Sequence, residues 1–409
     1  MKILRTVFIV ALILNLFFTS LVRYVIITVF GNELLIYAVN AVMLVLTAKK
    51  FLGSLKVIRP AYIILYACIF FLIVLGLFTQ NLPQTLFAVY ILIPAFFSIA
   101  FHKDIATFIQ ANSRWFIFIY IALLGGVIYD YYFDFVWKTA LFTVGNVEKE
   151  IAKNWTAAGV ERVAGFCRSS FSAALALIIM MMILFYNLKS FTWKTLVFIS
   201  TIIGIYITTT KGCLISVFVI YAAYLSEFLP GNIKKPTLSF TAILFATILI
   251  LLPIYLFKVE VPYLSNDSLL DRINTTWPLA FTLFKEPWHL IFGTGIGSLG
   301  APQLLFGNPN LYNPGDNLFI YVFANYGLLG LFLILFLLGK FVEFGNQNRI
   351  ATYFTMLIFT YGITTNLIES PECQILFGYL IAFYGSRSSL SNSLSYSGYI
   401  KTPALSFFR

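Results

Sequence analysis

The chain has 409 residues, of which 60% are hydrophobic and 11% are charged, and its mean hydropathy is +0.91. A soluble domain carries about 25% charged residues, so the composition excludes a water-soluble globular protein. The net charge is +11, but no basic run is interleaved with stacking aromatic residues, which argues against a nucleic-acid partner.

Long apolar runs recur along the chain, and each is long enough to cross about 30 Å of hydrocarbon as a helix. The runs are continuous rather than alternating, which favours helices over a closed barrel. The twelve predicted spans are residues 6–29, 34–48, 61–79, 83–101, 114–131, 169–187, 191–209, 212–229, 238–257, 317–338, 350–367 and 372–385. We therefore expect an all-α, polytopic integral membrane protein with a single transmembrane domain over residues 1–385.

The distribution of lysine and arginine predicts the orientation of these spans. A cytoplasmic N-terminus places most basic residues in short cytoplasmic loops and most acidic residues at the other face. Both termini are then cytoplasmic, and two long loops, about 132–168 and 258–316, lie in the periplasm of a bacterial inner membrane. The serine-rich residues 386–409 are typical of a disordered cytoplasmic tail.

The second long loop contains the sequence HLIFGTGIGSLG, which matches G-x-G-x-x-G at Gly295, Gly297 and Gly300. Asp316 follows about 20 residues later, as in a dinucleotide-binding fingerprint. That fingerprint has physical meaning only between a strand and a helix of a soluble βαβ unit, whereas transmembrane helices flank this loop. The sequence therefore excludes a nicotinamide or flavin site, and we expect Gly293, Gly295 and Gly297 to let the loop turn sharply.

Few residues are suited to metal or nucleotide chemistry. The chain has 4 cysteines and 2 histidines, with no C-x-x-C pair, no cluster at metal-ligand spacing and no Walker loop. We expect neither a cofactor nor a metal ion.

Four cationic residues lie near the outer ends of predicted spans, against the positive-inside trend. They are Arg162, Arg168, Lys211 and Arg272. Together they offer several N–H donors for a diphosphate, and arginine grips phosphate oxygens bidentately. The alternative is that they pair with lipid phosphates or with nearby acidic residues. Those acidic residues are Glu148, Glu150, Glu161 and Asp271.

Four segments, in this order, resemble the O-antigen polymerase and ligase superfamily, the Wzy-type enzymes of bacterial surface-polysaccharide assembly. They are RVAGFCRSSFSAA, TTTKG, DRINTTWPLAFTLFKEPWHLIFGTGIGSLG and DNLFIYVFANYGLLG. The resemblance covers roughly residues 160–340 and the multi-span architecture. The ligases carry a histidine where this chain has Asp316, which favours a polymerase. Lys211 stands where the family has an arginine, so it keeps the charge but loses the bidentate fork.

The resemblance implies a metal-independent glycosyltransferase that moves a growing glycan from polyprenyl diphosphate to a lipid-linked repeat unit. Asp316 would be the general base, with His289 as the alternative base and helix capping as the alternative role of Asp316. The four cations would bind the diphosphate. The implied partners are the polyprenyl-diphosphate-linked oligosaccharide, membrane lipid, a chain-length regulator and a flippase.

Two other functions stay open. An O-antigen ligase performs the same chemistry with lipid A–core as the acceptor. A lipid-linked oligosaccharide flippase or other transporter should line a path through the bilayer with ionisable residues, whereas Arg23 is the main mid-span example here. Five aromatic residues in the long loops are candidates for stacking on sugars or for anchoring at the interface. They are Trp137, Trp155, Tyr263, Trp277 and Tyr312.

Overall fold

The structure is a computed structural model in which helices dominate. It describes residues 2–54, 60–144, 147–153, 156–157, 160–228, 241, 243–248, 251, 272–308, 312–344 and 348–387. Most of the predicted span 238–257, and residues 388–409 of the predicted tail, lie outside the described residues. The chain divides into two compact units. The first contains Met1–Thr47 and Phe97–Leu225, and the second contains Ala48–Phe96 and Ser226–Arg387.

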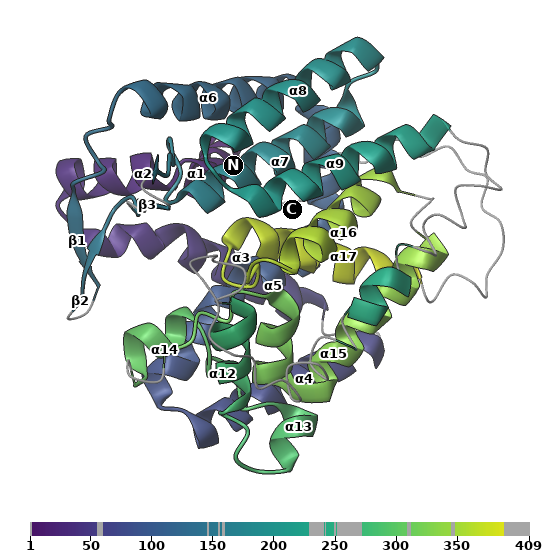
Figure 1. The fold of residues 1–409 in the computed structure, drawn as a ribbon. Helices are drawn as coiled ribbons and strands as arrows, with labels where there is room; N and C mark the ends of the chain where they lie inside the picture. Colours follow the sequence, from purple (N-terminus) through teal and green to yellow (C-terminus); the bar gives the residue numbers. More distant parts are fainter. Residues whose placement is uncertain are drawn as a thin grey trace. The chain divides into compact units, whose positions relative to one another are not determined.

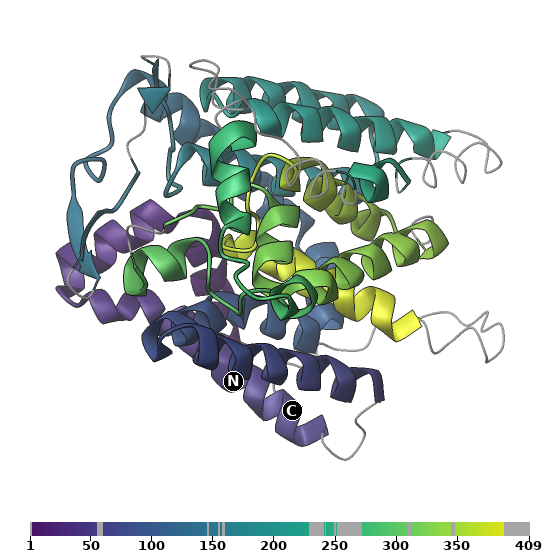
Figure 2. The same cartoon turned by 60° about the horizontal axis from the view of Figure 1, so that its bottom comes forward.

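The first unit is built mainly from long helices (Figure 1). Its elements are α1 (Lys2–Phe17), α2 (Thr19–Val25), η1 (Ile26–Phe30), η2 (Glu33–Tyr37), α6 (Ser113–Tyr132), α7 (Ser170–Asn187), α8 (Phe191–Ile207) and α9 (Lys211–Leu225). Two helices begin in one unit and end in the other: α3 (Ala38–Ser54) and α5 (Leu82–Ala111). Helices α6 to α9 pack against one another, and both views show them side by side (Figures 1 and 2). Helix α7 is apolar all round and almost entirely buried, as expected of a helix at the centre of a bundle.

The connection between α6 and α7 contains two short antiparallel hairpins. In the first, β1 (Leu141–Val144) pairs with β2 (Val147–Glu150). In the second, β3 (Thr156–Ala157) pairs with β4 (Val160–Glu161). The first predicted long loop therefore has secondary structure of its own, and the chain is nearly rather than entirely α-helical.

The second unit combines helices with a long irregular segment. Its elements are α4 (Pro60–Thr79), η4 (Ser226–Phe228), η5 (Arg272–Thr276), α12 (Trp277–Phe281), α13 (Trp288–Phe292), α14 (Ala301–Phe306), α15 (Leu318–Phe344), α16 (Arg349–Gly362) and α17 (Pro371–Arg387). Helix α15 contacts α12, α13, α16 and α17. Its regular backbone is interrupted at Gly327, where φ is 61° and ψ is −151°.

Six of the described helices are long and apolar enough to cross a membrane, or seven elements if a bent pair near the N-terminus counts as one span. The six are Glu33–Gly53, Leu82–Ala111, Ser113–Tyr132, Ser170–Asn187, Lys211–Phe228 and Leu318–Phe344. Large apolar side chains such as Phe118 and Phe332 are exposed on them, as lipid-facing residues are. The coarse prediction of a multi-pass helical membrane protein is therefore supported, while the count of twelve spans stays a prediction.

The first predicted span, residues 6–29, is not one straight helix. The axis bends by 113° between Phe17 and Thr19, because Phe18 has non-helical torsion angles (φ −125°, ψ 41°). The backbone N–H of Ser20 donates to Phe166 O at 3.0 Å, and Ser20 Oγ donates to Cys167 O at 2.9 Å. These bonds to a distant part of the chain replace the hydrogen bonds of a continuous helix.

Candidate functional site

The glycine-rich segment of the second unit, residues 293–300, lies between two short helices rather than between a strand and a helix. All of Gly293, Gly295 and Gly297 have positive φ, at 77°, 93° and 87°, the region that favours glycine. A Cβ at Gly293 would collide with the backbone of Asn325, and one at Gly295 would collide with the side chain of Thr79. The segment thus turns sharply and packs directly against α15 and the end of α4.

The backbone N–H groups of this glycine segment are largely occupied by the protein itself. Thr294 N donates to Ala324 O at 2.8 Å. The side-chain oxygen of Asn325, which is fully buried, accepts from the N–H groups of Gly297 and Ser298 and from Ser298 Oγ, each at 3.1 Å. A phosphate-binding loop needs N–H groups that point at the ligand, so this geometry suits a loop that shapes the site and does not bind a nucleotide.

Arg272 and Asp316, which are far apart in the sequence, meet in the second unit. Arg272 Nε lies 3.3 Å from Asp316 Oδ2, and the two side chains are 30% and 36% exposed. Arg272 Nη1 also donates to Thr364 O at 2.8 Å. The guanidinium is therefore fixed between the carboxylate and the connection between α16 and α17, and both charged groups remain accessible.

Asp316 does not cap α15, because Asn317 does. The Oδ1 atom of Asn317 accepts from the N–H groups of Phe319 and Ile320, at 2.8 and 3.1 Å, which is the geometry of an N-cap. Asn317 Nδ2 donates to Ile363 O at 2.7 Å. The capping alternative considered for Asp316 belongs to its neighbour, so capping does not account for an acid at position 316.

Glu369, in the connection between α16 and α17, is a further acidic residue near this site that the sequence analysis missed. Glu369 Oε1 accepts from Ala301 N at 2.8 Å, and it lies so close to Gly300 that no side chain fits there. Burial is the largest of three effects that together raise the pKa of Tyr312 to about 12, and the charges of Glu369 and Asp316 are the other two. The sequence could have indicated Glu369, because this acidic residue lies just beyond the predicted outer end of the span 350–367.

The ring of His289, the alternative base, is hydrogen-bonded within its own loop. Its Nδ1 accepts hydrogen bonds from the backbone N–H groups of Lys285 and Glu286, both at 3.1 Å. The ring is neutral in this arrangement with its proton on Nε2, and burial lowers its pKa, with the charge of Lys285 acting in the same direction and that of Glu286 opposing it. Neither ring nitrogen is then free to accept a proton from a substrate, which argues against His289 as the base.

Arg162 and Arg168 belong to the first unit and flank a tightly held turn. The buried carboxylate of Asp130 accepts from the N–H groups of Ala164 and Gly165 through Oδ2, at 3.0 and 2.8 Å. Gly165 has φ 61° and lies against the backbone of α6. The turn between the two arginines is therefore fixed by a side chain from the preceding helix.

The nearest acid to Arg162 in the sequence is bound to another cation. Glu161 Oε1 lies 2.8 Å from Lys138 Nζ, which also lies 3.2 Å from Asp130 Oδ1 and 2.7 Å from Asp134 Oδ1. Burial lowers the pKa of Lys138, but its hydrogen bonds to Asp134 and Glu161 and the charge of Asp130 outweigh burial and raise it. Glu161 is thus engaged elsewhere, contrary to one of the pairings considered above.

The two arginines carry charge that the described residues do not fully satisfy. The Nε atoms of Arg162 and Arg168 are buried and have no hydrogen-bond partner in the described part of the chain. Burial lowers the pKa of Arg168, with a smaller opposing effect from Tyr37. A buried guanidinium atom without a partner is unfavourable, and an anionic ligand would satisfy it.

Lys211 is the exposed first residue of α9, also in the first unit. Thr209, two residues before Lys211, has φ 56°. A β-branched residue in the left-handed region is strained, and such strain clusters at functional sites. Among the described residues, the structure thus brings Arg272 and Asp316 together in one unit and places Arg162, Arg168 and Lys211 in the other.

The aromatic candidates differ in how much of the ring is accessible. Trp137 and Trp277 are 6% and 3% exposed, so their ring faces are unavailable for stacking on a sugar. Tyr312 is 40% exposed and retains that possibility. Trp155 and Tyr263 lie outside the described residues.

Within the described residues there is no group of three His, Cys, Asp or Glu side chains arranged to hold a metal ion. In comparisons with known proteins, no protein-family model, no curated protein and no solved structure matches the chain. The residues and their geometry are therefore the basis for inferring a function.

Proposed function

We propose that the protein is a polymerase that extends a glycan on polyprenyl diphosphate at the periplasmic face of a bacterial inner membrane. The observation that carries the proposal is the contact between Arg272 and Asp316 at the start of α15, where Asn317 already provides the cap. The order of the motifs that resemble Wzy-type polymerases supports the same function.

In the proposed reaction, Asp316 accepts the proton of the attacking hydroxyl of the lipid-linked repeat unit. The hydroxyl oxygen forms a bond to the anomeric carbon of the growing glycan, while the bond from that carbon to the carrier diphosphate breaks. The bonding electrons leave with the diphosphate, whose charge the cationic residues stabilise. Arg272 holds the carboxylate of Asp316 in place by its fixed contact with Thr364 O.

Arg162, Arg168 and Lys211 are the further candidates for the diphosphate. The unsatisfied Nε atoms of the two arginines favour this role, because guanidinium groups bind phosphate oxygens with paired N–H donors. Lys211 adds an exposed point charge.

The proposal includes a topology of twelve spans with both termini in the cytoplasm and both long connecting segments in the periplasm. A reporter fused after Gly145 or Asn308 should then read periplasmic, and one fused after Lys235 or Arg387 should read cytoplasmic. A reversed reading at any of these positions would contradict the orientation of the neighbouring spans.

Deletion of the gene in its own host tests the function. We expect surface lipopolysaccharide with a single repeat unit on its core, because export and ligation survive, as seen on a gel together with analysis of the carrier-linked pool. Core without any repeat unit, with polymer accumulating on the carrier, would identify a ligase instead. Retention of the lipid-linked unit on the cytoplasmic face would identify a flippase.

A further inference from the structure

The second unit contains buried polar atoms that have no hydrogen-bond partner among the described residues, and we consider three of them: Asn274 Oδ1, Trp277 Nε1 and Asn366 Nδ2. Trp277 is 3% exposed and Asn366 is 9% exposed. Folded proteins leave few buried polar atoms unpaired, so each such atom needs an explanation. All three belong to chain segments that contain Arg272, bind it, or bind the turn before Asp316, and this grouping points to a binding site.

Two of these residues, Asn274 and Asn366, lie in the segments that contain or bind Arg272. Arg272 lies in η5 together with Asn274, and its Nη1 bonds to Thr364 O at 2.8 Å. Asn366 lies two residues beyond Thr364, and its Oδ1 is fixed by the N–H of Ile368 at 3.0 Å. The amide nitrogen of Asn366 is therefore the part of this side chain that lacks a partner.

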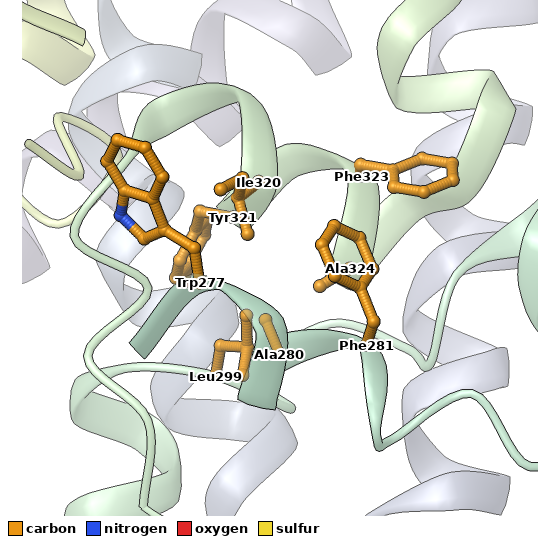
Figure 3. Packing of buried hydrophobic residues seen from close by; sticks show 8 residues of the cluster. All are labelled: Trp277, Ala280, Phe281, Leu299, Ile320, Tyr321, Phe323 and Ala324. Carbon is orange, nitrogen blue, oxygen red and sulfur yellow. The ribbon is translucent and has the colours of Figure 1, made fainter. Parts of the chain in front are cut away.

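The position of Trp277 is set by packing on the other side of the same segment. Its ring belongs to a buried apolar cluster with Leu299, Ile320 and Tyr321, and Ile368 packs against that cluster (Figure 3). Figure 3 shows the indole nitrogen on the side of Trp277 that faces away from the other labelled side chains. The cluster therefore covers the ring, while the N–H edge lies on the side away from these residues and is itself buried.

The turn that carries Asp316 is tied to this same segment. Asn313 Nδ2 donates to Thr276 O, the carbonyl just before Trp277, at 2.7 Å. Asn313 Oδ1 accepts from Gly315 N at 2.8 Å, which fixes the turn just before Asp316. The three unpaired atoms therefore belong to chain segments that are bonded directly to Arg272 or to the Asp316 turn.

The chemistry of the three atoms selects one class of ligand. Two are neutral N–H donors and the third, Asn274 Oδ1, is a neutral acceptor. The diphosphate of a lipid-linked sugar, esterified at both ends, carries no proton at neutral pH that it could donate to that acceptor, and a hydrocarbon chain would leave all three atoms unsatisfied. Sugar hydroxyl groups both donate and accept, so a carbohydrate satisfies the whole set.

We propose that Asn274, Trp277 and Asn366 bind the ring hydroxyl groups of the acceptor sugar and thereby present its attacking hydroxyl to Asp316. This inference rests on the proposed polymerase function. It assigns the indole of Trp277 a role through its N–H edge and not through stacking of its face.

Two conservative variants of the full-length protein test the subsite. Trp277→Phe removes the N–H and retains an aromatic ring in the cluster, while Asn366→Asp retains the oxygen that accepts from Ile368 N and removes the amide donor. Trp115→Phe, at a ring that is 66% exposed, is the matched control. Melting temperatures without ligand establish that each variant is folded.

The first measurement is the rise in melting temperature of the purified protein with the free oligosaccharide, released from its carrier by mild acid. A ligand that binds only the folded state stabilises it in proportion to the logarithm of ligand concentration over Kd. We expect wild type and Trp115→Phe to be stabilised equally, and each subsite variant to bind about tenfold more weakly, since one hydrogen bond is worth roughly that factor.

The second measurement is the initial rate of polymerisation against the concentration of carrier-linked repeat unit. We expect about a tenfold rise in the half-saturating concentration for each subsite variant, with little change in the maximal rate. Unchanged binding and unchanged half-saturation in variants of an active enzyme would overturn the subsite alone. If wild type makes no polymer, the proposed function fails, and the acceptor assignment fails with it.

Discussion

The two segments that carry the candidate arginines are held in place by different interactions. The described part of residues 133–169, in the first unit, is fixed by buried charge, because Asp130 binds both Lys138 and the backbone of the Ala164–Gly165 turn. The described part of residues 272–317, in the second unit, is fixed by close backbone packing, in which glycines such as Gly293 lie directly against α15.

The arginines of the two segments also differ in their hydrogen-bond and ion-pair partners. In the first unit, carboxylates bind Lys138, and the Nε atoms of Arg162 and Arg168 are left without a hydrogen-bond partner in the described part of the chain. In the second unit, Arg272 is paired with Asp316. Unsatisfied positive charge suits a departing diphosphate, whereas a carboxylate oriented by an arginine suits proton transfer.

The largest effect is expected at Asp316. Asp316→Asn retains the shape of the side chain but removes the base, so polymer formation should fall by about 10²- to 10⁴-fold. The melting temperature should stay near that of wild type, because the cap of α15 is Asn317. Polymer length on a gel and activity of the purified protein measure the effect.

Asn317→Ala is the control for Asp316→Asn. It removes the cap and should cost about 1 kcal/mol of stability, so its melting temperature should fall. Polymer of wild-type length from Asp316→Asn would end the general-base proposal and leave the pair with Arg272 as a structural contact.

Removal of Asp130 should have the next largest effect, on stability. The side chain of Asp130 is 1% exposed and that of Lys138 is 9% exposed, and removing one partner of a buried pair costs about 3–5 kcal/mol. Asp130→Ala also leaves the N–H groups of Ala164 and Gly165 without their acceptor. Unfolding of the purified protein, followed by circular dichroism, measures the loss.

Asp134→Ala is the matched control, because Asp134 contacts the same lysine nitrogen with a side chain that is 77% exposed. An exposed ion pair contributes about 0.2–1 kcal/mol. Equal losses in the two variants would show that buried charge does not hold the first segment in place.

Substitution of Gly293 tests the backbone packing of the second segment. Gly293→Ala places a Cβ against the backbone of Asn325 at φ 77° and should destabilise the protein by about 1–3 kcal/mol. Gly339→Ala, in the regular part of α15 with no atom within 4 Å of the new Cβ, should be neutral or stabilise by up to about 1 kcal/mol. A melting temperature that falls equally in both variants would contradict the packing argument.

The sequence predicted several helices well because their signal is local. A continuous apolar run marks α6 and α7, and the predicted spans 114–131 and 169–187 match their observed bounds closely. The bend at Phe18 was missed because the hydrogen bonds of Ser20 reach Phe166 and Cys167. No local pattern in residues 6–29 reports such a distant partner.

The distinction between local patterns and distant contacts also applies to the candidate site. Residue type and position predicted Arg272 and Asp316 as site residues, but the contact between them depends on the fold. The capping role, an alternative for Asp316, belongs to Asn317, since both are good cap residues and only the geometry separates them. Asn366 and Glu369 were missed because their proposed roles depend on residues that are distant in the sequence and that only the fold places near them.

His289 provides the smallest expected effect, and it depends on pH. Two backbone N–H groups donate to Nδ1, so protonation of the ring would break both bonds. Because burial lowers the pKa of His289 in the folded state, the unfolded state takes up the proton first as the pH falls. The stabilisation from His289 is therefore fully present above the unfolded pKa of about 6.5 and is lost as the pH falls below it.

The melting temperature of wild type should consequently fall between pH 7.5 and pH 5.5 by more than that of His289→Asn, whose amide oxygen accepts hydrogen bonds without titrating. At pH 7.5 the variant should retain most of the polymerisation activity, because the wild-type ring is neutral and its Nδ1 is occupied by the loop. If His289→Asn instead loses polymer formation at pH 7.5 while its melting temperature is unchanged, His289 takes part in the reaction. His289 would then replace Asp316 as the candidate general base.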